Sequence, residues 1–223
     1  CIALMNAQTC TPFTQTMFYQ DFETPTSSTL NETVNSAKST VNYSNNTNYA
    51  IGKRSRMVNK KNADIDYGNA NVSYASNVKV SFSFAPQNID YISDNIKFYI
   101  STNGGTTWSK ELEIYSKNYY TFLFWDFSSP LTYDFSSTNI YTSTYDGNNS
   151  PDILYISDTN KKNKVEISIP NNVNKTNLRF KFEIENNDND DYWFLDDIKI
   201  TGDYIDTKTW NGTSWTGRTT STP

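Results

Sequence analysis

The 223-residue sequence contains no histidine and only two cysteines. The absence of histidine excludes a histidine general base, the serine and cysteine triads that depend on one, and the usual zinc sites. The two cysteines, Cys1 and Cys10, allow at most one internal disulfide. An enzyme built on this chain would therefore have to use carboxylate, tyrosine or lysine chemistry.

The sequence also lacks the apolar stripe of an amphipathic helix, and charged residues make up only 19% of it. Aromatic residues are frequent instead, with 16 Tyr, 13 Phe and 5 Trp. Residues 77–85 and 178–185 alternate apolar and polar side chains, which is the pattern of a strand with one buried face. These features predict an all-β domain of short strands joined by polar loops.

Positive charge is scarce, and the formal net charge is −5. Nucleic-acid binding needs a clustered basic face, so this composition argues against it. One basic cluster occurs at Lys53, Arg54, Arg56, Lys60 and Lys61. We interpret it as a solvated strand edge, because lysine on an edge discourages pairing with other chains.

Three parts of the chain differ in composition. Residues 1–7 form an apolar run that closes on Ala7, as at the end of a secretory signal peptide; the alternative is an ordinary first strand. Residues 8–203 carry the strand patterns and form the predicted domain. Residues 204–223 are rich in Trp, Thr and Gly, which indicates a linker or the start of a following module.

The predicted strand at 192–200 contains an acid where an apolar residue is expected. By parity, Asp196 shares a face with Phe194, Ile198 and Ile200. Burial of a carboxylate without a partner costs several kcal/mol, so Asp196 should lie near a cation, a group of main-chain donors or a metal. The alternative is a twist or bulge that lets both Asp196 and Asp197 reach water.

Two further segments bear on binding. Residues 119–127 are unusually aromatic, and exposed rings there would form a platform for sugar rings; the alternative is core packing. The candidate binding residues are Tyr119, Tyr120 and Trp125. Residues 59–71 hold Asp64, Asp66 and Gly68, which we interpret as a solvated turn, because the full calcium-loop pattern is missing.

Several motifs together resemble a known family. They are Asp21-Phe-Glu23, the turn at 101–108 with its Gly104-Gly105 pair, the strand from Leu178, and the segment 191–198. This combination resembles the MAM-like and cleaved-adhesin-like jelly-roll domains of secreted and cell-surface proteins of the Bacteroidetes. The hairpin at 101–108 is also similar to the Asp-box of sialidase propellers, but it occurs once and has Asn103 at the Asp position.

The resemblance implies a two-sheet antiparallel jelly-roll sandwich, concanavalin-like or MAM-like, with the first and last strands side by side. It further implies a structural calcium ion between those strands. Glu23 and Asp196 would be ligands, with Asp21 and Asp197 as helpers. The paired cysteines of animal MAM domains are absent here.

Three functions are expected on these grounds. The first is a non-catalytic adhesion or carbohydrate-binding domain of an exported multidomain protein, secreted or at the cell surface, monomeric and bound to a glycan or another surface polymer. The second is a structural spacer attached to a secreted enzyme. The third is a laminarinase-like glycoside hydrolase, for which Glu111 with Glu113 and Glu183 with Glu185 offer acids two residues apart without completing the catalytic run.

Overall fold

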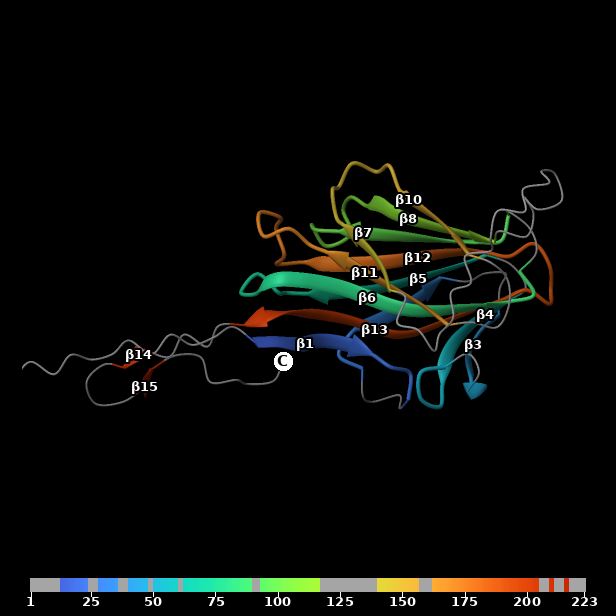
Figure 1. Cartoon of the computed structure of the whole chain (residues 1–223), viewed down its shortest axis with the longest axis horizontal. Coiled ribbons are helices and arrows are strands. Elements are labelled where there is room, and N and C mark those ends of the chain that lie inside the picture. Colours follow the sequence, from blue (N-terminus) through green and yellow to red (C-terminus); the bar gives the residue numbers. More distant parts are fainter. Residues whose placement is uncertain are drawn as a thin grey trace, which may run out of the picture.

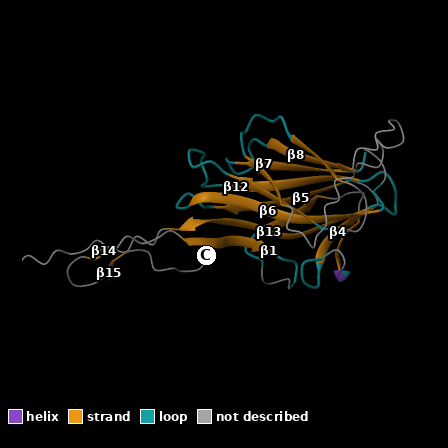
Figure 2. Ribbon diagram, in the orientation of Figure 1, coloured by secondary structure: helices purple, strands orange, loops and turns teal. Residues whose placement is uncertain are grey.

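The computed structural model describes residues 13–23, 28–35, 40–47, 50–59, 62–89, 93–116, 140–156, 162–204, 209–210 and 215–216. They form strands joined by loops and turns (Figure 2), which confirms the all-β prediction. Among these residues, none forms a helix of the length and hydrophobicity that a bilayer span requires. In chain order the strands are β1 (Phe13–Gln20), β2 (Asn31–Asn35), β3 (Thr40–Ser44), β4 (Ser55–Asn59), β5 (Ala63–Ala70), β6 (Ser76–Gln87), β7 (Asn95–Ser101), β8 (Ser109–Ser116), β9 (Ile140–Thr144), β10 (Asp152–Ile156), β11 (Asn163–Ser168), β12 (Leu178–Glu185), β13 (Tyr192–Tyr204), β14 (Thr209–Trp210) and β15 (Trp215–Thr216).

Two sheets pack face to face as a jelly-roll-type β-sandwich (Figure 1). The six-stranded sheet has the order β10-β8-β7-β12-β5-β2. The seven-stranded sheet has the order β3-β4-β13-β6-β11-β9, with β1 also paired to β13. β14 and β15 pair only with each other.

The predicted antiparallel pairing needs one correction, because both sheets are mixed. β10 pairs with β8 in parallel, and β9 pairs with β11 in parallel. Each of these pairs joins strands that are not connected by a tight hairpin, so no turn imposes the antiparallel direction. The remaining pairs among the described strands are antiparallel, as expected.

The first and last strands of the sandwich lie side by side, as the resemblance implied. β1 runs antiparallel to β13 from the pair Phe13 and Tyr204 to the pair Gln20 and Ile198. In Figure 1 both strands lie at the lower edge of the sandwich. The residue directly after β1 is therefore brought close to the middle of β13.

Apolar faces of both sheets form one core between the layers. In β12 the predicted alternation is confirmed, since Leu178, Phe180, Phe182 and Ile184 are fully buried. Phe82 of β6 packs from the opposite sheet, with its ring centroid 4.9 Å from that of Phe182. Burial of each such side chain contributes on the order of 1.5–3 kcal/mol. The phenylalanine rings between the two sheets therefore stabilise their packing.

The prediction of a solvated turn at 59–71 is wrong. Residues 63–70 form β5, which pairs with β12 on one side and β2 on the other. Ala63, Ile65 and Tyr67 are buried, and they alternate with Asp64 and Asp66. Asp64 and Asp66 are common turn residues, but a strand with one exposed face can also carry Asp on that face.

The predicted face of Asp196 is also wrong, because β13 contains a bulge. Leu195 belongs to the main core, whereas Phe194 packs in a separate cluster with Ala85. The pairing register with β6 shifts after Asp196, where Asp197 has a positive φ of 48°. A bulge adds one residue and reverses the parity of the residues after it. Asp196 therefore shares its side with Phe194 and not with Ile198 and Ile200.

Candidate functional site

The bulge does not expose Asp196, which is only 3% accessible. Its carboxylate accepts a hydrogen bond from the main-chain N–H of Ile51 and another, at 2.7 Å, from that of Asp197. Burial raises the pKa of Asp196 to about 7, since the two main-chain hydrogen bonds do not offset the lost hydration and since Asp197 and Glu23 are negative. Of the partners predicted for this acid, the structure supplies main-chain donors.

Glu23 reaches the same loop from the other end of the chain. Its Oε1 accepts hydrogen bonds from the main-chain N–H of Lys53 at 2.7 Å and of Arg54 at 3.1 Å. A Cβ on Gly52 would lie 2.4 Å from that oxygen, and Gly52 has a φ of +97°. Glycine is thus required here. Glu23 and Asp196 together clamp residues 50–54, which we call the 50–54 loop.

The other two predicted calcium ligands have different partners. Asp21 accepts a hydrogen bond from the N–H of Glu23 at 3.1 Å. Asp197 forms an ion pair with Lys199, with the shorter contact at 2.8 Å. Within the described ranges, no group of three or more acidic, cysteine or histidine side chains is arranged to hold a metal. Glu23, after β1, and Asp196, in β13, both bind the 50–54 loop, and carboxylate oxygens are the atom type that calcium prefers. The calcium site stays a prediction.

A second polar region covers the outer face of the six-stranded sheet, meaning the face directed away from the core. Cross-strand register arranges its side chains in rows. One row runs through Glu113, Lys97, Glu183 and Asp64. The neighbouring rows place further side chains beside it, namely Tyr155, Tyr115, Asn95 and Glu185 on one side, and Lys110, Tyr99, Lys181 and Asp66 on the other.

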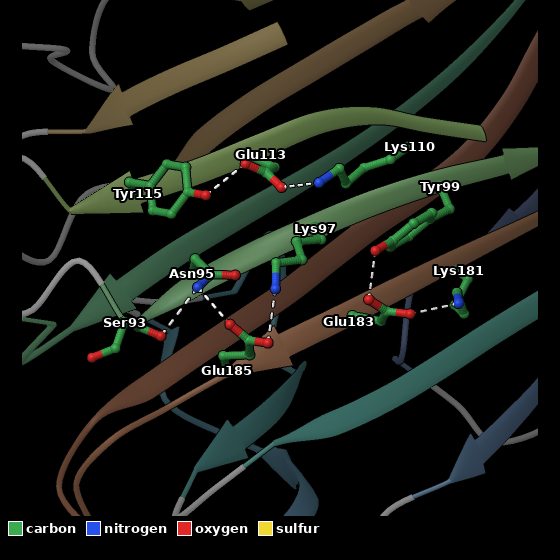
Figure 3. Close-up of polar contacts among 10 residues, drawn as sticks. All are labelled: Ser93, Asn95, Lys97, Tyr99, Lys110, Glu113, Tyr115, Lys181, Glu183 and Glu185. Carbon is green, nitrogen blue, oxygen red and sulfur yellow. Dashed lines mark hydrogen bonds and ion pairs between the residues drawn. The ribbon is translucent and has the colours of Figure 1, made fainter. Parts of the chain in front are cut away.

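Most charges on this outer face are paired (Figure 3). Lys97 contacts Glu185 at 2.8 Å and Lys181 contacts Glu183 at 2.6 Å. Two further ion pairs join Lys110 to Glu113 and Arg179 to Asp66. Tyr99 donates to Glu183 at 2.6 Å, and Tyr115 donates to Glu113. The face is thus a hydrogen-bonded network of fixed orientation.

These partners set the ionisation of the outer-face acids. Burial alone would raise the pKa of Glu113, but hydrogen bonds from Lys110 and Tyr115 outweigh it and hold the pKa below its usual value. In the same way, Lys181 and Tyr99 hold the pKa of Glu183 low against its desolvation. Both groups are carboxylates at neutral pH, and neither is suited to donate a proton as a general acid.

Aromatic rings flank the charged row. Tyr155 is 42% exposed, and its ring centroid lies 6.0 Å from that of Tyr115. Tyr99 and Trp108 are partly exposed, and Lys181 Nζ lies 4.4 Å and 5.3 Å from their ring centroids. Lys181 therefore covers part of the Tyr99 and Trp108 rings, which leaves the Tyr115 and Tyr155 pair as the more open platform.

The hairpin at 101–108 is docked on this face by Arg179. Its guanidinium donates to the carbonyl of Gly104 at 3.2 Å and lies 5.8 Å from the ring of Trp108. A Cβ on Gly105 would lie 2.9 Å from Arg179 Nη1, and one on Gly68 would lie 2.4 Å from its Cγ. The two glycines therefore leave room for the arginine that places Trp108 next to the sheet.

A bulge in β8 separates the two acids of the Glu111–Glu113 pair. The register with β7 shifts between Phe98 and Tyr99, so Lys110 reaches the side of Glu113. Glu111 instead accepts a hydrogen bond from the N–H of Asp146 at 3.3 Å. The two predicted hydrolase acids on this strand thus have separate surroundings.

The predicted sugar-stacking residues Tyr119, Tyr120 and Trp125 lie outside the described residues. The aromatic side chains on the outer face, Tyr99, Trp108, Tyr115 and Tyr155, were not predicted as binding residues. For Tyr99 the sequence does hold a signal, because residues 96–100 alternate and place Tyr99 on the polar side with Lys97. The contact between Tyr155 and Tyr115 could not be predicted from the sequence, because it depends on the parallel pairing of β10 with β8.

No family model matches the sequence, and no curated protein matches it. Solved structures do. A family 61 carbohydrate-binding module in complex with β-1,4-galactotriose is 12% identical, with 81% of this chain and 92% of that chain covered and a TM-score of 0.47. The CBM22-1 xylan-binding domain from Paenibacillus barcinonensis is 12% identical, with coverages of 90% and 99% and a TM-score of 0.46. The K2 cleaved adhesin domain of Lys-gingipain is 15% identical, with coverages of 82% and 96% and a TM-score of 0.40. At such values, the function of this chain has to be inferred from its own side chains.

Proposed function

We propose that the chain is a non-catalytic carbohydrate-binding domain that holds a glycan on the outer face of the six-stranded sheet. The observation that carries this proposal is the outer-face network itself, in which the Tyr115 and Tyr155 rings lie beside a row of fixed charged groups. Flat rings complement the C–H face of a sugar, and fixed polar groups satisfy its hydroxyls. A purely structural spacer needs neither on an open face.

The two acids of the network that have lysine and tyrosine partners are poorly suited to be the general acid of the hydrolase alternative. Glycoside hydrolysis needs one carboxyl group that is protonated at working pH and a second that is ionised. Glu113 and Glu183 are both held ionised by a lysine and a tyrosine. Burial raises the pKa of Glu111, but this group accepts a hydrogen bond from the main-chain N–H of Asp146 and has other surroundings than Glu113. Binding without turnover is the function that these groups support best.

The proposal includes a structural calcium ion at Glu23 and Asp196, with Asp21 and Asp197 as helpers. Its support is the convergence of two carboxylates on the 50–54 loop and the burial of Asp196 without a cationic partner among the described residues. Bound calcium would supply the missing positive charge. The adhesive role and export to the cell surface also belong to the proposal. Residues 1–7, which the sequence predicts to be the end of a signal peptide, lie outside the described residues.

The test is glycan binding by the whole chain and by two matched tyrosine variants. Tyr155→Ala removes a ring that is 42% exposed on the outer face, and Tyr74→Ala removes one that is 39% exposed elsewhere. Affinity electrophoresis and calorimetry should show about a tenfold loss, roughly 1.4 kcal/mol, for Tyr155→Ala alone. Equal affinities of the two variants, or release of reducing sugar from any glycan, would contradict the proposal.

A further inference from the structure

On the outer face of the six-stranded sheet, one carboxylate has no cationic partner. Its four cations, Lys97, Lys110, Arg179 and Lys181, each form an ion pair with a carboxylate of the same face. Asp64 is left over, since the structure gives it no ion pair or hydrogen bond with the residues it describes. The described part of the face therefore has no spare cation and one spare anion.

Asp64 stands in a position that costs stability. It lies directly opposite Glu183 in the β5–β12 pair, and like charges in directly opposed positions destabilise a sheet. Burial raises the pKa of Asp64, and the negative charges of Glu183 and Glu185 raise it further, against the opposing effect of Lys181. A residue that weakens the fold in this way, on a face rich in aromatic rings, is a candidate for a binding role.

We infer that the outer face selects a neutral glycan and that Asp64 is the residue that selects it. This inference rests on the proposed function. An unpaired carboxylate accepts hydrogen bonds from neighbouring hydroxyl groups of one sugar, and such charge-assisted bonds are among the stronger ones. The same carboxylate repels uronic acids and sulfated sugars, because no unpaired cation on the described part of the face compensates it.

The Asp66 position shows why Asp64 and not its neighbour has this role. Asp66 lies two residues further along β5, on the same face, and is bound by the Arg179 guanidinium. Its charge is therefore already neutralised within the face. A sugar hydroxyl that approaches Asp66 competes with a guanidinium, whereas one that approaches Asp64 does not.

The experiment compares the whole chain with Asp64→Asn and Glu166→Gln. Glu166→Gln removes one negative charge from the other sheet, where Glu166 is paired with Lys79 and Lys164, and so controls for net charge. The probes are neutral xylan, galactan and β-1,3-glucan, and the acidic polymers polygalacturonate, alginate and carrageenan, all at low ionic strength. Melting temperatures are recorded for every variant.

The wild type should bind at least one neutral polymer and no acidic one. Asp64→Asn should lose roughly 10- to 100-fold in affinity for it, while its melting temperature rises because a like-charge pair is relieved. Glu166→Gln should bind as the wild type does. Unchanged affinity in Asp64→Asn, or preference for an acidic polymer, would overturn this inference and leave the proposed function standing. Binding of no polymer of either class would overturn the proposed function.

Discussion

The molecule provides its buried and half-buried carboxylates with hydrogen-bond partners in two different ways. On the outer face of the six-stranded sheet, Glu113 and Glu183 are held by lysines and tyrosines, and their pKa values are low. At the 50–54 loop, Glu23 and Asp196 are held by main-chain N–H groups, and the pKa of Asp196 is raised to about 7. Main-chain donors bring partial charges only, so they orient a carboxylate without neutralising it. Glu113 and Glu183 are therefore neutralised at neutral pH within their own region, whereas Asp196 would gain from a cation.

The largest expected difference between the two regions is their response to calcium, measured as a change in melting temperature. A ligand that binds only the native state at 100 times its dissociation constant adds about 2.7 kcal/mol of stability, or roughly 5–10 °C in melting temperature for a domain of this size. Asp196→Ala and the milder Asp196→Asn should abolish the shift. Asp203→Ala, at the exposed end of the same strand, should keep it. The absence of any shift in the wild type, by calorimetry with and without chelator, would remove the calcium site.

Glycine substitutions compare the same regions without any ion. Gly52→Ala forces a side chain into a φ of +97° and against Glu23, and should cost about 1–3 kcal/mol in urea unfolding. Gly68→Ala needs no positive φ, but it forces the stem of Arg179 to move and so disturbs the ion pair with Asp66; it should cost about 1 kcal/mol. A larger loss for Gly68→Ala would show that the outer face, and not the loop, is the more rigid region.

Lowering the pH should change the stability contributions of Glu183 and Asp64, which face each other, in opposite directions. The lowered pKa of Glu183 contributes stability that is present above the usual glutamate pKa and is lost as pH falls through its folded value. The raised pKa of Asp64 contributes stability that is present at low pH and is lost as pH rises through its folded value. In melting curves from pH 3 to 7, Glu183→Gln should flatten the acid-side decline and Asp64→Asn should steepen it, each by about 0.5 kcal/mol. Parallel shifts of both profiles would contradict the assigned directions.

Strand alternation made most of the core predictable. The apolar faces at 77–85 and 178–185 are buried as predicted, because a period of two assigns the faces as long as a strand is regular. Prediction failed where regularity ends. One extra residue at Asp197 reversed the face of Asp196, and a bulge at β8 brought Lys110 to Glu113. Nothing local in the sequence marks either position.

The sequence predicted residues of one candidate site but not of the other. Glu23 and Asp196 were found from motifs, and the structure brings both to the 50–54 loop, which the motifs did not indicate. The outer face was not found, because its rows are assembled from β5, β7, β8, β10 and β12, and long-range register decides which side chains meet. For Asp64 in particular the sequence predicts a turn, although the residue lies in a strand.

The pairing of β1 with β13 determines how the domain responds to a pulling force. Phe13 and Tyr204 are opposite each other at the same end of the pair. Tension applied to the chain before Phe13 and after Tyr204 therefore opens the pair from that end, one hydrogen bond at a time, like a zipper. The opening then advances toward Gln20 and Ile198, just before the residues that clamp the 50–54 loop. The clamp would then resist further opening, together with the pairing of β13 to β4 and β6, and an ion bound there would raise the force that is needed.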